Sequence, residues 1–174
     1  MENTQKDFKL EIKGIDGEGI FSGLAASYDT VDDGDDLIER GAFARTLKEQ
    51  GPTRPLLWQH KNDTPVGSIT LTDSPEGLRC SGRLLLAVDD ARKAYALMKA
   101  GIVKGLSIGY QSVDATYRGA VRVLKEIKLF EVSLVTFPMN DAAIVTAVKD
   151  RAGSDGEALA IIASIRRDVQ RLTS

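Results

Sequence analysis

Apolar and polar residues alternate over much of the chain, with the two-residue period of half-buried strands. Residues 8–12 show the pattern most simply, as Phe-Lys-Leu-Glu-Ile. The predicted strands cover residues 8–12, 20–28, 55–60, 66–71, 78–87, 106–113 and 121–137. Most of them are joined by hairpin-length turns, such as those at 73–77 and 118–119. We therefore expect an α+β fold whose centre is a mainly antiparallel, closed β-barrel flanked by helices.

Two segments between the strands have helical character. Residues 42–50 have a helix-forming composition and end at Gly51-Pro52. A second helix is predicted from Asp89-Asp90, whose two acids suit the positive end of the helix dipole. Its apolar positions recur at helical spacing, and they are Ala91, Ala94, Tyr95, Met98 and Ile102.

The character of the chain changes at Asp150. Residues 151–156 read as a linker, and a helix with a heptad-like apolar seam follows. The seam consists of Ala158, Ile162, Ile165, Val169 and Leu172. We therefore divide the chain into a domain at 1–150 and a linker with a C-terminal helix at 151–174. That helix could serve as an interface, dock on the domain, or be a removable tail.

The composition of the 174 residues is that of one ordinary globular domain, with 43% hydrophobic and 28% charged residues. A net charge of −2 gives no basic surface for nucleic acid, so we expect no nucleic-acid partner. Cys80 is the only cysteine, which excludes an intrachain disulfide and a cysteine metal cluster and suits a reducing compartment. No signal peptide or apolar run of ~18 residues is present, so no membrane association is expected.

Residues 105–109, Gly-Leu-Ser-Ile-Gly, match the G-x-S-x-G pattern of a nucleophilic serine. In α/β-hydrolases that serine follows a strand and precedes a helix, whereas here a helix precedes Ser107 and a strand follows it. The hydrolase elbow is therefore excluded by its context. What remains is a serine between glycines, a pattern that on its own is more often structural than catalytic.

His60 is the only histidine, and it lies where an apolar strand meets a polar turn. A single histidine cannot build a histidine metal cluster, and no metal or other cofactor is predicted. A serine nucleophile needs a base that is neutral near pH 7, and His60 is the only histidine that could serve Ser107. An ordinary surface histidine at a strand end remains the alternative.

Glu131 lies in the apolar strand at 121–137, where a carboxylate must be paired or hydrogen-bonded. Its partner could be a lysine or arginine in a buried salt bridge, or it could be His60, completing a triad. Weaker candidates for the third member are Asp63, Asp90 and Glu126.

The acidic loop at 29–36 has the carboxylates and the glycine of a calcium-binding loop in part only. Val31 occupies a ligand position and Arg40 falls where a bidentate glutamate belongs, so calcium binding is not expected. A solvated turn or a loop beside a substrate groove fits the sequence better.

Four segments, in this order, resemble the prohead proteases of tailed bacteriophages, whose fold is related to that of the herpesvirus capsid-maturation protease. They are Gly34-Asp35 leading to Glu39-Arg40-Gly41-Ala42-Phe43, Leu57-Trp58-Gln59-His60 with Pro65-Val66-Gly67, the segment from Gly105 to Tyr110, and Leu129 to Asn140. Their order makes the resemblance more specific than any one of them would.

This resemblance implies a serine endopeptidase that needs no cofactor, with Ser107 as nucleophile, His60 as base and, less securely, Glu131 as third member. It implies cleavage of a scaffolding protein or of a scaffold-like segment of the major capsid protein, and of the protease itself. It places the enzyme in the host cytoplasm, inside the assembling procapsid, and suggests self-association. Two rivals remain: a non-enzymatic capsid or scaffold assembly protein with this fold, and a generic serine esterase.

Overall fold

The computed structural model describes residues 4–9 and 17–137, and of residues 4–9 only the backbone. This part of the chain contains eight strands and two helices. They are β1 (Thr4–Lys9), β2 (Ile20–Ser27), β3 (Asp36–Ile38), α1 (Ala44–Gln50), β4 (Thr53–Trp58), β5 (Lys61–Ser74), β6 (Gly77–Leu84), α2 (Asp89–Lys99), β7 (Gly105–Arg118) and β8 (Val121–Val135). The predicted linker and C-terminal helix at 151–174 lie outside the described residues.

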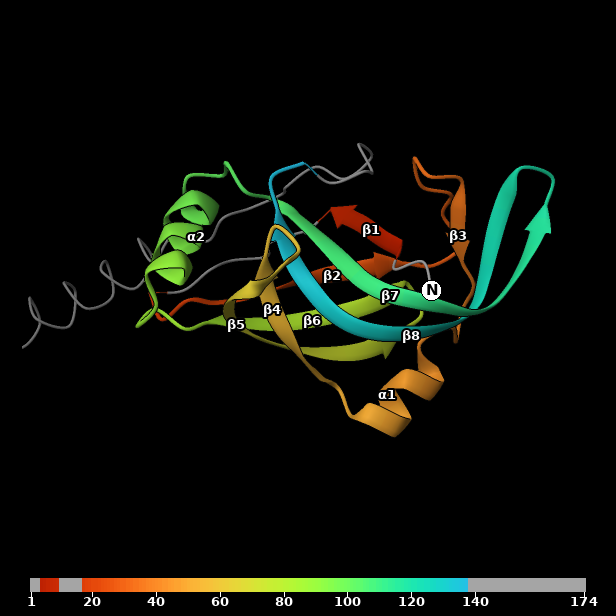
Figure 1. Cartoon of the computed structure of the whole chain (residues 1–174), viewed down its shortest axis with the longest axis horizontal. Helices are drawn as coiled ribbons and strands as arrows, with labels where there is room; N and C mark the ends of the chain where they lie inside the picture. The colour runs from red at the N-terminus through yellow and green to blue at the C-terminus, as the bar shows by residue number, and fades with distance from the viewer. Residues whose placement is uncertain (1–3, 10–16, 138–174) are drawn as a thin grey trace, which may run out of the picture.

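One sheet organises the fold, with the strand order β1-β7-β8-β4-β5-β6-β2 and with β3 paired to β8 off this path. The pairs β3–β8 and β4–β8 are parallel, and the remaining pairs are antiparallel. Figure 1 shows β7 and β8 as long, curved neighbours that end in a hairpin beyond the other strands, while α2 lies at the opposite end. The predicted mainly antiparallel β-structure with two helices is confirmed.

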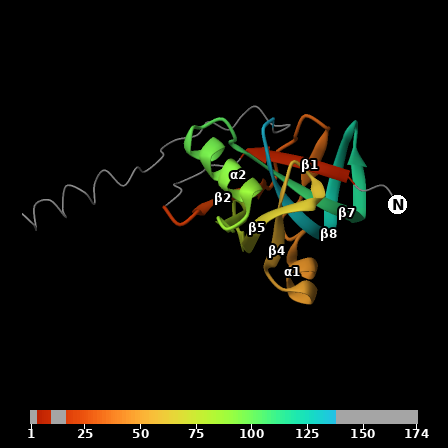
Figure 2. The ribbon, with the colours of Figure 1, turned by 60° about the vertical axis from the view of Figure 1, so that its left-hand side comes forward.

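The predicted closure of the barrel is wrong. The sheet curls until β1 and β2 approach each other, but within residues 4–9 and 17–137 no ladder joins these two edge strands, so the sheet is open. Figure 2 shows β1 beside β7 at one edge. Hairpin turns determine which consecutive strands pair, whereas closure depends on the accumulated twist and stagger of every strand, which local sequence patterns do not reveal.

The core lies inside the curl of the sheet, where buried side chains from nearly every strand meet the inner faces of the helices. Close packing is visible where Phe21 of β2 lies over Gly82 of β6, because a Cβ at Gly82 would fall 2.2 Å from the Phe21 ring. The largest fully buried side chains are Tyr110, Phe21, Phe43, Ile38, Leu56, Ile69, Leu78, Leu106, Ile108 and Leu124.

Helix α2 buries Ala91, Ala94 and Met98, which confirms most of its predicted apolar face. Ile102, in contrast, is 57% exposed. The helix ends at Lys99 and Gly101 takes a φ of 68°, so the chain leaves the helical path before Ile102 could reach the buried face.

Candidate active site

The site is assembled on one face of the β7–β8 pair. Ser107 of β7 lies directly opposite Ser133 of β8, and Gly109 lies opposite Glu131. Directly opposed residues of an antiparallel pair project to the same face, with Cβ atoms roughly 5 Å apart. Ser107 and Ser133 have no exposed surface.

His60 reaches this face from a two-residue turn between β4 and β5. Trp58 pairs with Lys61, so Gln59 and His60 form the turn, and both have positive φ, 52° and 57°. The strands predicted at 55–60 and 66–71 leave the turn between them to residues 61–65, but those residues belong to β5. Parallel pairing of Trp58 with Leu134 brings the turn to β8.

Two contacts of Gln59 attach this turn to β8. The Gln59 backbone N–H donates to the Leu134 carbonyl at 3.0 Å, and its side-chain amide donates to the Thr136 hydroxyl at 2.7 Å. Tertiary contacts thus hold a backbone conformation that non-glycine residues adopt at a cost.

Three hydrogen bonds join His60, Glu131 and Ser133. His60 Nδ1 lies 2.9 Å from Glu131 Oε1, the Ser133 hydroxyl donates to Glu131 Oε2 at 2.8 Å, and the His60 backbone N–H donates to Ser133 Oγ at 3.2 Å. An ionised carboxylate only accepts, so its contact with the ring requires the proton on Nδ1. Nε2 is then the ring nitrogen with a lone pair.

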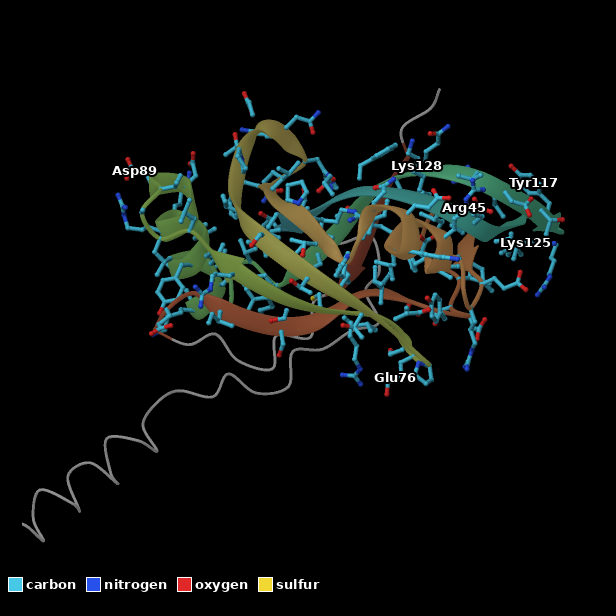
Figure 3. The ribbon with its side chains drawn as sticks, turned by 90° about the horizontal axis from the view of Figure 1, so that it is seen from below. Arg45, Glu76, Asp89, Tyr117, Lys125 and Lys128 are labelled. Carbon is cyan, nitrogen blue, oxygen red and sulfur yellow. The ribbon has the colours of Figure 1, made fainter. Side chains whose placement is uncertain are left out.

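The structure therefore brings the three predicted site residues to one place: His60 and Glu131 contact Ser133, and Ser107 is its partner across the strands. Of the two partners considered for Glu131, the structure gives it His60. The weaker candidates lie elsewhere: Glu126 pairs with Arg45 at 3.0 Å, and Asp63 accepts a hydrogen bond from Thr64 at 3.0 Å. The last, Asp90, is in the first turn of α2 (Figure 3 labels its neighbour Asp89 at that end).

Sequence reasoning missed two residues of the site. Ser133 contacts both His60 and Glu131, and Gly109 leaves the space that Glu131 occupies, since a Cβ there would lie 2.4 Å from Oε1. A signal for each was present: a serine two positions after the buried glutamate, and a second glycine two positions after Ser107. The second glycine of G-x-S-x-G thus serves a steric purpose here.

The site is almost closed to solvent. Ser107 is fully buried, and the His60 and Glu131 side chains are 13% and 11% exposed.

Residues 4–9 and 17–137 hold no group of three or more histidine, cysteine or acidic side chains arranged for a metal ion. Within the same ranges, no helix is long and apolar enough to span a membrane.

Three curated phage proteins are similar to this chain. A prohead protease of Enterobacteria phage HK97 is 32% identical over 150 residues, covering 83% of this chain and 67% of that protein. A capsid polyprotein of Pseudomonas phage PAJU2 is 30% identical, covering 86% of this chain and 23% of the polyprotein. A prohead protease of Escherichia phage T5 is 30% identical, covering 58% of this chain and 48% of that protein.

A solved structure, the capsid assembly protease of bacteriophage T4, has the same fold. The match has a TM-score of 0.60 at 14% identity and covers 79% of this chain and 98% of that one. The sequence model of the caudovirus prohead serine proteases matches residues 6–156. This chain therefore belongs to the family of caudovirus prohead serine proteases, which are serine peptidases.

Proposed function

We propose that this chain is a serine endopeptidase of procapsid maturation in which Ser107 is the nucleophile, His60 the general base and Glu131 the residue that orients it. The observation that carries the proposal is the 2.9 Å contact between His60 Nδ1 and a nearly buried Glu131, on the face that Ser107 shares. It leaves Nε2 as the proton acceptor of the only histidine in the chain.

In the proposed mechanism, His60 Nε2 takes the proton from Ser107 Oγ as Oγ attacks the scissile carbonyl carbon. The imidazolium then returns this proton to the leaving amine as the C–N bond breaks. Water repeats the sequence on the acyl-enzyme and releases Ser107. Glu131 stabilises the imidazolium without taking its proton, and backbone N–H groups near Ser107 would stabilise the oxyanion, each by about 3 kcal/mol.

The proposed substrates are a scaffolding protein or a scaffold-like segment of the major capsid protein, together with the protease itself. Support comes from the relatives: two are called prohead proteases, and a third is a capsid polyprotein in which the similar region makes up 23% of the length. We place this activity inside the assembling procapsid in the host cytoplasm. Self-association and a relation to the herpesvirus protease fold remain predictions from the resemblance.

Ser107→Ala and His60→Ala test the proposal. Each variant is co-expressed with the capsid and scaffolding proteins encoded by the same phage, and processing is followed by gel electrophoresis and intact-mass spectrometry. Both should abolish processing, because a triad without its nucleophile or base loses catalysis by several orders of magnitude. Circular dichroism should show an unchanged β-sheet signal.

Ser112→Ala is the matched control, since Ser112 is a half-buried serine on the same strand, opposite Ile127. It should process substrate as the unmodified chain does. Processing that continues in Ser107→Ala or His60→Ala would overturn the assignment. A folded wild-type chain that turns over small esters but no capsid or scaffolding protein would favour the esterase, and one that does neither would favour the assembly protein.

A further inference from the structure

Ser133 bridges the base of the proposed triad and its carboxylate. We infer that Ser133 is a positioning residue, whose hydroxyl holds the His60 imidazole in the one tautomer and orientation that can accept a proton from Ser107. This inference rests on the proposed roles of Ser107 and His60.

The first argument is that the hydrogen bonds form a closed ring that begins and ends at His60. The imidazole meets Glu131 Oε1 at 2.9 Å, the other carboxylate oxygen accepts from Ser133 at 2.8 Å, and Ser133 Oγ accepts from the His60 backbone N–H at 3.2 Å. A hydroxyl has a single proton. Because that proton is directed at Glu131, the oxygen is left to accept from His60, and both ends of the histidine residue are held by one network.

The second argument is conformational. Gln59 and His60 both have a left-handed backbone, which is strained in non-glycine residues and persists only when neighbouring groups hold it. The bond from His60 N–H to Ser133 is one of the contacts that hold it. Without this acceptor, the His60 backbone loses one of the hydrogen bonds that attach the turn to β8.

The third argument concerns the carboxylate. Glu131 lies in a site where its side chain is 11% exposed, and the Ser133 hydroxyl satisfies the oxygen that faces away from the ring. A buried carboxylate oxygen that loses its donor turns toward other donors or water. Either movement frees the imidazole from Oε1, and with it the preference for a proton on Nδ1.

The chain contains one histidine, so its imidazole signals in an NMR spectrum belong to His60 without further assignment. We would label the full chain with ¹⁵N and record long-range ¹H–¹⁵N correlations from the ring across a pH titration. In the unmodified chain we expect one protonated nitrogen, Nδ1, and one unprotonated nitrogen, Nε2. In Ser133→Ala we expect the two nitrogens to average, and the pH at which the ring takes its second proton to fall. The fall is expected because an imidazole freed from Glu131 Oε1 loses the carboxylate that stabilises its charged form.

Thr136→Ala is the matched control. It removes a hydrogen bond of the same turn to the same segment, that from the Gln59 side chain, and its hydroxyl contacts neither oxygen of Glu131 in the hydrogen bonds described. A residue that only stabilises the turn would give the same result in both variants. We expect Thr136→Ala to keep the single-tautomer spectrum and the titration midpoint of the unmodified chain, even if its melting temperature falls.

Ser133→Cys provides a second test for the case in which Ser133→Ala does not fold. The thiol is close in shape to the hydroxyl but is a weaker donor. This variant should give a spectrum between those of the unmodified chain and Ser133→Ala. A folded Ser133→Ala or Ser133→Cys chain whose ring spectrum and titration match the unmodified chain would overturn the inference. Failure of the proposed function shows separately, as processing that survives in Ser107→Ala whatever the ring spectrum shows.

Discussion

Gly109 shows how little space the proposed site leaves. Its backbone does not require glycine, but a Cβ would lie 2.4 Å from Glu131 Oε1 and 2.9 Å from Cδ. The carboxylate would have to move away from His60. We therefore expect Gly109→Ala to slow processing of the capsid or scaffolding protein by about 100-fold, because a displacement of about 1 Å in a catalytic group costs that much.

The measurement is a time course of processing in the co-expression assay, with thermal unfolding as the check on folding. Gly34→Ala is the matched control, since a Cβ there would meet only Asp32 Oδ1 at an ordinary 3.5 Å. Processing by Gly109→Ala at the rate of Gly34→Ala would show that the carboxylate position does not matter.

Among individual residues, the sequence predicted those site residues whose side-chain chemistry or setting is distinctive. A single histidine, a serine between glycines and a glutamate in an apolar strand could be singled out without a structure. Ser133 and Gly109 could not, because their importance comes from the register that sets them opposite Ser107 and Glu131. Register depends on pairing between distant segments, and serine and glycine are common in strands for other reasons.

Strand β3 is held by an ion pair between a buried Asp36 carboxylate and a partly exposed Arg122 guanidinium. The Arg122 guanidinium donates to both oxygens of Asp36 at 2.7 Å, and the Tyr110 hydroxyl donates to Asp36 at 3.2 Å. The hydrogen bonds of the guanidinium to Asp36 raise the pKa of Arg122. The pair anchors the acidic loop at 29–36 to β8.

Removing the Arg122 guanidinium should therefore lower the stability of the fold. We expect Arg122→Ala to lower the free energy of unfolding by roughly 2–3 kcal/mol in urea titrations, somewhat below the value for a fully buried pair because Arg122 is 27% exposed. Arg40→Ala breaks the exposed ion pair with Asp29 and should cost less than about 1 kcal/mol. Equal losses of unfolding free energy in the two variants would show that burial of the pair between Arg122 and Asp36 adds nothing to stability.

Most elements with a clear period were predicted well, and the shortest strand was not. The strand expected at 8–12 overlaps β1 (Thr4–Lys9) only at residues 8–9, and its remaining residues lie outside the described part of the chain. Both helices and the strands β2, β4, β6 and β8 lie within a few residues of their predicted places. β3 was missed, because its three residues carry no period and owe their conformation to Arg122 and to pairing with β8. The turn at 59–60 was misplaced, because Gln59-His60 is not one of the Asn-Gly, Asp-Gly or Gly-Gly pairs that are typical of a two-residue turn with positive φ.

At the scale of the whole molecule, burial of ionisable groups makes stability depend on pH. Desolvation raises the pKa of the Cys80 thiol from 9.0 to about 12. Between these values the unfolded chain loses a proton that the folded chain keeps, so stability falls as the pH rises above about 9. Tyr28 and Tyr110, whose hydroxyls also have raised pKa values because of burial, act in the same direction at higher pH.

We expect the thiol alone to reduce stability by about 1.4 kcal/mol per pH unit in this range. Urea titrations at pH 8, 9 and 10 measure it. Cys80→Ala should be less stable at pH 8 because it leaves a cavity, but its deficit should shrink between pH 9 and pH 10. A constant deficit across the series would contradict the prediction.

The overall shape was predicted only in part. The mainly antiparallel sheet followed from the hairpin turns, but its openness did not, and neither did the parallel pairings of β8 with β3 and β4. Figure 1 shows β8 as the strand that these elements share. Local sequence patterns do not reveal that several strands pair with β8, because these strands are far apart in the chain.

The place of β8 at the end of the described fold also has a consequence for the order of synthesis. His60 and Glu131 are separated by 71 residues, and the parallel pairing of β4 with β8 that brings them together joins equally distant segments. A chain that ends before β8 lacks Glu131 and also the strand to which the turn at 59–60 is attached. The proposed triad therefore cannot assemble during synthesis until β8 has been made, because contacts between such distant segments require both segments to be present.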